Sequence, residues 1–238
     1  AGDIAADAVN NTVAADIIDV TTNITNIIGG TYTSSDNTDL TASVEIGGVT
    51  VQATGGAILT ATSGDIVNTT VEGDVVELTA GRNISNAAVE AAETATLLAG
   101  TDVSGTSVTA GGAVTITATA GTIQGTTALG GSTMDLTAGT EIDGSDFTAA
   151  SDITVAATDL AASSFISETG DINVGTVANI IDSTIWAKAG AVTIADVTEE
   201  LDGSTVSAAT NLTVSAEWVV GSSLIAENGL LDVDATTI

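Results

Sequence analysis

The sequence predicts an all-β protein: a single-stranded parallel β-helix (β-solenoid) of about twelve coils of 19–20 residues, with three short strands per coil. Three observations support this fold class. Branched apolar residues recur at a nearly fixed step, polar residues alternate with them, and the chain has 26 Gly but no Pro. Because proline removes a donor from strands that have neighbours on both sides, its absence fits stacked strands.

The fixed step defines a first apolar column. From Val20 onward its members follow at a nearly constant step of one coil, whereas Ile4 stands closer to Val20 than one full step. The column consists of Ile4, Val20, Leu40, Leu59, Leu78, Leu97, Ile116, Leu136, Val155, Val174, Ile194, Val214 and Val233. Residues two positions earlier are nearly all apolar and residues one position earlier nearly all polar, which is the alternation of a half-buried strand.

Two further apolar columns complete each coil. The second column, about six residues after the first, consists of Ile46, Ile66, Ile84, Val103, Ile123, Ile142, Leu160, Ile180, Leu201 and Val220. The third column, roughly eleven residues after the first, consists of Val71, Val89, Val108, Leu129, Phe147, Ile166, Ile185, Val206 and Leu224. Turn residues such as Gly64-Asp65 stand between the columns. Each strand is too short to be stable alone, so stability must come from stacking.

The period runs through residues 1–238 without a change in composition, which predicts a single β-solenoid domain and no linker. A helix is the alternative for the Ala-rich stretch 87–99, but the Thr, Val and Ile content and the in-phase columns favour strands. Aromatic residues make up only 2% of the chain. We therefore expect Val, Ile, Leu and Ala to fill the core.

The charge balance restricts the partners. The chain has 31 Asp and Glu against 2 Lys and Arg, a formal net charge of −29. Such a surface repels nucleic acid and anionic membranes, because proteins bind both of these through Lys and Arg side chains. It attracts divalent cations or basic partners, unless its only role is to keep the protein soluble. No apolar run is long enough to cross a bilayer, so membrane insertion is not expected.

We do not expect an enzyme. The chain has no His and no Cys, so the most common general base and the thiol nucleophile are missing. Its two basic side chains, Arg82 and Lys188, fall in different coils and cannot form one lyase site. Two acidic pairs keep a carbohydrate-active enzyme open as a less favoured alternative. They are Asp143 with Asp146 and Glu199 with Glu200.

One pair of acids is a candidate metal site. Asp19 and Asp39 share one phase in successive coils, so their carboxylates should stand about 5 Å apart. Like charges at this separation repel unless a cation such as Ca²⁺ bridges them. Ordinary solvated carboxylates are the alternative, and no other cofactor is expected.

Threonine and the aromatic residues leave further alternatives open. Triplets such as Thr60-Ala61-Thr62 are similar to those of ice-binding solenoids, but the threonine column is interrupted, which makes ice binding a less favoured function. The interruptions are Leu98, Ala156, Gly175, Ala195 and Asp234. Trp186, Trp218 and Tyr32 could anchor a neighbouring subunit, stack on a polysaccharide, or fill the core.

The two ends of the sequence show no capping pattern. Solenoids expose an unpaired strand edge at each end, which usually needs a cap. We therefore expect head-to-tail contacts between identical copies through Ala1 and Ile4 at one end and Val233 and Ile238 at the other. A contact of this kind does not close and builds a filament. The alternatives are a fragment of a longer solenoid and unconventional caps.

The repeats resemble those of a known family. Segments 78–86 (LTAGRNISN) and 136–144 (LTAGTEIDG) are similar to repeats of filamentous-haemagglutinin-type adhesins and related bacterial surface β-solenoids. The resemblance covers most of the chain. It implies a right-handed helix, secretion and a role at the cell surface.

Together these features predict a structural subunit of an extracellular, acidic filament or surface appendage. Its main partner would be itself, with divalent cations or polysaccharide as further partners. The alternative is a stalk or adhesive binding segment of a larger secreted adhesin.

Overall fold

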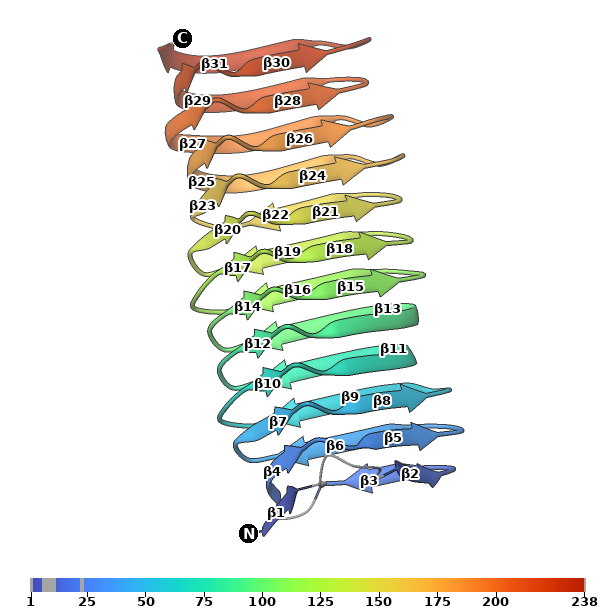
Figure 1. Ribbon diagram of the computed structural model, residues 1–238. Helices are drawn as coiled ribbons and strands as arrows, with labels where there is room; N and C mark the ends of the chain where they lie inside the picture. Colours follow the sequence, from blue (N-terminus) through green and yellow to red (C-terminus); the bar gives the residue numbers. More distant parts are fainter. Residues whose placement is uncertain (1, 6–11, 22–23, 238) are drawn as a thin grey trace. The chain divides into compact units, whose positions relative to one another are not determined.

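The computed structural model describes residues 2–5, 12–21 and 24–237 and divides into two compact units, Ala1–Thr119 and Ala120–Ile238. Each unit is a stack of parallel strands (Figure 1), and the two units together hold about twelve coils. Within the described ranges every regular element is a strand, so no membrane-spanning helix is found there. The predicted all-β parallel solenoid is confirmed, whereas its right-handedness and single-domain organisation stay predictions.

Unit 1 contains the first sixteen strands. They are β1 (Gly2–Ala5), β2 (Thr12–Ala15), β3 (Ile18–Val20), β4 (Ile24–Ile28), β5 (Thr31–Ser34), β6 (Thr38–Ala42), β7 (Glu45–Gly47), β8 (Thr50–Ala53), β9 (Gly56–Ala61), β10 (Ile66–Val67), β11 (Thr70–Ala80), β12 (Ile84–Ser85), β13 (Ala88–Ala99), β14 (Val103–Ser104), β15 (Ser107–Ala110) and β16 (Val114–Ala118).

Unit 2 contains the remaining strands. They are β17 (Ile123–Gln124), β18 (Thr127–Gly130), β19 (Met134–Ala138), β20 (Glu141–Asp143), β21 (Asp146–Ala149), β22 (Ile153–Ala156), β23 (Asp159–Ala161), β24 (Ser164–Ser167), β25 (Ile172–Ile181), β26 (Thr184–Ala187), β27 (Val192–Asp202), β28 (Thr205–Ala208), β29 (Leu212–Val220), β30 (Ser223–Ala226) and β31 (Leu231–Thr237).

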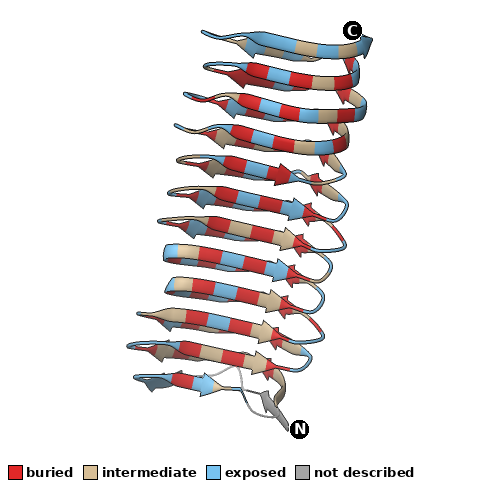
Figure 2. Ribbon diagram, turned by 180° about the vertical axis from the view of Figure 1, so that it is seen from behind, coloured by how far each residue is buried: buried red, intermediate tan, exposed pale blue. Residues whose placement is uncertain are grey.

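Three parallel ladders run through each unit, one for each predicted apolar column. In unit 1 the first ladder pairs β3, β6, β9, β11, β13 and β16, and in unit 2 it pairs β19, β22, β25, β27, β29 and β31. Leu40, Leu59 and Leu78 stand in register there and are fully buried. Figure 2 shows buried and exposed residues alternating along the strands. The predicted first column is confirmed from Val20 onward.

The third column was predicted one residue out of register at two positions. Leu129 and Ile166 face outward, and Ala128 and Phe165 take the inward positions beside Phe147. A shift of one residue moves a side chain to the opposite face of a strand. Both sites contain two adjacent apolar residues, so alternation alone could not decide between them. The inward choice lets the rings of Phe147 and Phe165 stack with centroids 5.5 Å apart.

Two further residues, Val220 and Ile4, were also wrongly assigned to their columns. Val219, not Val220, pairs with Leu201 in the second ladder, and Val220 faces solvent. Ile4 pairs with Ile27 in the second ladder and therefore does not belong to the first column. The step from Ile4 to Val20 is shorter than a full coil because it joins two different ladders.

The corners after the second ladder of unit 2 share one construction. A residue with φ between 47° and 59° turns the chain at Gly125, Gly144, Ala162, Asp182, Gly203 and Gly221. The following hydroxyl residues are Thr126, Ser145, Ser163, Ser183, Ser204 and Ser222. The backbone N–H of Ser163 donates to Ser183 Oγ at 3.3 Å, and the N–H of Ser183 donates to Ser204 Oγ at 3.0 Å. We call this series of hydrogen bonds the serine ladder.

Removing one hydroxyl from the serine ladder should destabilise unit 2. In Ser183→Ala the buried backbone N–H of Ser163 loses its acceptor, which should lower the free energy of unfolding by about 1–3 kcal/mol. Urea denaturation followed by circular dichroism measures the change.

Thr69 provides the matched comparison, because it occupies the equivalent corner in unit 1 and its buried hydroxyl has no hydrogen-bond partner. Val49 fills the same position in the adjacent coil. Thr69→Val should therefore leave the stability unchanged or raise it by up to about 1 kcal/mol. Equal losses in Ser183→Ala and Thr69→Val would contradict the assignment of the stabilisation to the hydrogen bond.

Candidate interaction surfaces

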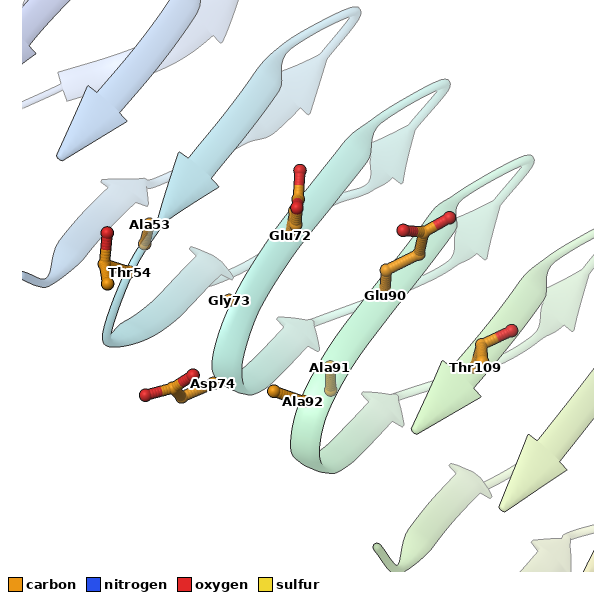
Figure 3. Close-up of a pocket in the computed structure, with 9 residues that line it drawn as sticks. All are labelled: Ala53, Thr54, Glu72, Gly73, Asp74, Glu90, Ala91, Ala92 and Thr109. Carbon is orange, nitrogen blue, oxygen red and sulfur yellow. The ribbon is translucent and has the colours of Figure 1, made fainter. Parts of the chain in front are cut away.

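The outward side of the third ladder in unit 1 has a polar and acidic hollow. Glu72, Glu90 and Thr109 line it and follow one another in register on β11, β13 and β15, and Gln52 on β8 is the register neighbour of Glu72. Figure 3 shows Glu72 and Glu90 on adjacent strands, with Asp74 at the corner beside them. The hollow has a volume of about 600 Å³.

The hollow lies where β11 and β13 continue around a corner at which the strands of the neighbouring coils, β8 and β15, end. Its carboxylates have few hydrogen-bond donors nearby. One of them is Gln52 Nε2, which donates to Glu72 Oε2 at 3.3 Å. The described residues contain no group of three or more His, Cys, Asp or Glu that could hold a metal ion. The chemistry offered here is electrostatic attraction of positive charge.

The same outward position in unit 2 is apolar on four strands and carries the hydroxyl residues Thr148 and Ser207 on the other two. Strands β18, β21, β24, β26, β28 and β30 carry it, and we call it the apolar stripe. Its members in register are Leu129, Thr148, Ile166, Trp186, Ser207 and Ile225. Leu129 is 51% exposed and Trp186 is 38% exposed. Exposed apolar groups aligned in this way can contact a partner.

Trp186 contacts Lys188, one of the two basic residues of the protein. Lys188 Nζ lies 5.0 Å from the centroid of the Trp186 ring and 2.6 Å from Glu168 Oε1. The ammonium group thus has an aromatic face and a carboxylate from the adjacent coil as partners. Arg82, in unit 1, pairs with Asp65 at 3.7 Å. The two basic residues take part in separate contacts, each with an acid of the neighbouring coil.

A second hollow surrounds Trp218 in unit 2. Asn179, Glu199, Glu200, Glu217 and Trp218 line it, and its volume is about 320 Å³. Asn179, Glu200 and Trp218 are paired in register on β25, β27 and β29. The register shifts between Val197 and Glu200 in β27, and such irregularities redirect side chains. Trp218 is 50% exposed.

Acidic side chains continue along the ladder that leads to this hollow. Glu141 pairs with Asp159, which pairs with Asn179. Burial raises the pKa of Glu141, and the carboxylates of Asp143 and Asp159 raise it further. An acid whose pKa is raised in the folded state destabilises the fold when the pH is above this raised pKa. The destabilisation disappears when the pH falls below the ordinary pKa of the acid in the unfolded chain. Asn179 Nδ2 donates to Asp159 Oδ1 at 2.9 Å and to Glu199 Oε2 at 3.2 Å, which relieves the repulsion there.

The predicted neighbours Asp19 and Asp39 do stand in register on β3 and β6. Each carboxylate accepts a hydrogen bond from the hydroxyl of the threonine two residues later, from Thr21 at 2.6 Å and from Thr41 at 3.2 Å. Two carboxylates fall short of the six to eight oxygen ligands that Ca²⁺ takes, and the described chain adds no third acid to them. A cation bridge between these two residues stays a prediction.

The residues predicted for contacts between copies are described only in part. Ala1 and Ile238 lie outside the described residues, and only the backbone of Ile4 is described, in β1. Val233 lies in β31, in register with Val214, and is partly exposed.

The other candidates divide between core and surface. Tyr32 is a core residue in the third ladder, whereas both tryptophans lie at the surface. Asp143 accepts a hydrogen bond from Gln124 at 3.0 Å, and Glu199 and Glu200 both line the Trp218 hollow. The predicted threonine column of the first ladder runs through Thr41, Thr60 and Thr79, and is then interrupted by Leu98.

Sequence reasoning missed the apolar stripe and the Trp218 hollow. The stripe was missed because Leu129 and Ile166 were assigned to the core. The hollow was missed because its residues come from three coils whose corners differ in length. The useful signal was the adjacent pair Glu217-Trp218, in which two consecutive large polar or aromatic residues break the alternation of a strand.

No family model, curated protein or solved structure matches this sequence. No activity, ligand or partner is therefore carried over from a relative.

Proposed function

We propose that the protein is a structural subunit of an extracellular, acidic filament or surface appendage that grows by end-to-end stacking of copies. One observation carries the proposal. Leu231, on β31, is 45% exposed, although its register partners Leu212 and Val192 in the preceding coils are fully buried. An inward-facing apolar residue of this kind is stabilised when another coil covers it.

The strand edges support the same conclusion. Strands β30 and β31 pair with β28 and β29, and no further strand of unit 2 pairs with their outer edges within the described residues. Strands β2 and β3 of unit 1 pair with β5 and β6. Because β30 and β2 belong to the third ladder and β31 and β3 to the first, stacking one copy on another would continue both ladders. Such a heterologous contact does not close, so it builds a filament.

The extracellular location is part of the proposal, and so is a structural rather than catalytic role without a cofactor. It is supported by the resemblance of segments 78–86 and 136–144 to repeats of filamentous-haemagglutinin-type surface proteins, and by the acidic composition. The charge of −29 also predicts that stacking depends on salt, since copies repel each other beyond contact distance. At 0.15 M salt this repulsion is screened beyond about 8 Å.

Leu231→Lys should weaken stacking strongly and leave the fold intact. A charged ammonium buried between two coils loses its hydration without gaining a partner, which should weaken assembly by at least about tenfold. Electron microscopy and sedimentation velocity of the purified protein at 0.15 M salt measure the assembled fraction. Leu98→Lys is the matched control, because Leu98 is 41% exposed but faces outward from β13.

Filaments from wild type and Leu98→Lys, with dispersed particles from Leu231→Lys, would support the proposal. Dispersed wild-type particles at every salt concentration would contradict it. That outcome would favour the alternative, a stalk or adhesive segment of a larger secreted protein in which further coils of the same chain cover Leu231.

A further inference from the structure

We propose that the Trp218 hollow binds the cationic side chain, arginine or lysine, of a basic segment on a partner protein. The hollow joins an exposed indole to Glu199, Glu200 and Glu217. Its volume of about 320 Å³ is at the lower end of the range for ligand pockets, which suits a single side chain better than a large ligand. This inference is independent of filament assembly.

The protein itself shows how such a cation is held. Lys188 Nζ lies over the Trp186 ring at 5.0 Å and contacts Glu168, which stands on the adjacent coil, at 2.6 Å. The Trp218 hollow has the same two components, because Glu200 is the register neighbour of Trp218 on the adjacent strand. The difference is that neither basic side chain of the protein reaches it: Lys188 is paired with Glu168 and Arg82 with Asp65.

The hydrogen-bonding groups of the hollow also favour a cation over a neutral sugar. Its side chains offer the six oxygens of three carboxylates as acceptors. The amide of Asn179 already donates to Asp159 and Glu199, which leaves the indole N–H as the main remaining side-chain donor. Arginine, with five N–H donors, or lysine, with three, matches this surplus of acceptors. A sugar hydroxyl has one donor and two acceptor lone pairs, so it matches this surplus of acceptors less well.

The geometry of the corner keeps these groups in place. Glu199 and Glu200 both turn away from the core, between the buried residues Val197 and Leu201. On β29, Glu217 and Trp218 likewise both face away from the core, between the buried residues Ala216 and Val219, so the alternation of inward and outward residues is interrupted on both strands. The hydrogen bond from Asn179 to Glu199 fixes one carboxylate at the edge of the hollow.

Fluorescence titration can test the proposal, because the chain has only two tryptophans. In a Trp186→Phe background, Trp218 is the only indole and reports directly on the hollow. The probe is acetyl-Arg-Gly-Arg-amide at 0.15 M salt, and the neutral control is the same peptide with citrulline in place of arginine. We expect a saturable change with the arginine peptide and none with the citrulline peptide.

Calorimetric titration of three variants then separates the site from the general negative charge. Trp218→Ala should weaken binding of the arginine peptide about 3- to 30-fold through loss of the cation–π contact, and Glu200→Gln should also weaken it. Trp186→Ala, which removes the other exposed indole, should bind like the wild type. Circular dichroism checks that each variant is folded.

Equal affinities of Trp218→Ala, Trp186→Ala and wild type would overturn the proposal, because binding would then reflect net charge alone. A response of Trp218 to cellohexaose but not to the arginine peptide would overturn it as well. Either result would leave the filament proposal untouched, since that proposal is tested by assembly of Leu231→Lys.

Discussion

Phe147→Ala is expected to lower the free energy of unfolding of unit 2 by about 3–5 kcal/mol. The side chain is fully buried, and its ring stacks on that of Phe165 with centroids 5.5 Å apart. Aliphatic neighbours held in a regular ladder cannot move far enough to fill the volume that the ring leaves. Urea denaturation followed by circular dichroism measures the loss.

Leu129→Ala is the matched control for Phe147→Ala. Leu129 is a large apolar residue in the same ladder, but it faces solvent, so the change should alter stability by no more than about 0.5 kcal/mol. A loss at Leu129 as large as that at Phe147 would mean that the third ladder of unit 2 is shifted by one residue.

Gly100→Ala is expected to destabilise unit 1 by about 1–3 kcal/mol. A methyl group at Gly100 would collide with the backbone carbonyl oxygen of Gly81 in the adjacent coil. At Gly81, in turn, it would collide with the carbonyl oxygen of Thr62. The coils therefore approach each other too closely at Gly81 and Gly100 for a Cβ atom, and a backbone carbonyl cannot rotate away as a flexible side chain can.

Gly175→Ala separates this steric effect from a general effect of glycine replacement. The nearest neighbour of a methyl group at Gly175 is the carbonyl oxygen of Val155 at 3.6 Å, an ordinary contact. This change should be neutral or stabilise by about 0.4–1 kcal/mol, because alanine reduces the freedom of the unfolded chain. Thermal and urea unfolding of both variants measure the difference. A stable Gly100→Ala protein would show that the coils are farther apart at this corner than described.

The first ladder could be predicted from sequence almost residue by residue, and the reason is physical. Its strands place polar residues such as Asp39 and Thr41 on either side of Leu40, so only one register buries the apolar side chain. The same reasoning placed Asp19 beside Asp39 correctly. Errors arose where two apolar residues are adjacent, as at Phe165-Ile166, because either register then buries one of them.

The Trp218 hollow could not be predicted in the same way. Its residues come from β25, β27 and β29, and the register between these strands shifts at irregular positions such as Val197 to Glu200. A column traced by counting residues loses its phase at such points. The sequence contained the chemistry, an indole and several carboxylates, but only the paired strands show that they surround one hollow.

The corners of unit 2 have a consequence for how such a chain can change in length. Each closes with a residue of positive φ and a small hydroxyl residue, so each presents the same bonding groups to the coil before it and the coil after it. Gain or loss of one whole repeat by gene duplication or deletion would therefore join surfaces that already match. Gain or loss of a single residue within a strand would reverse the facing of the side chains that follow, up to the next corner. Selection on length should thus act in whole repeats.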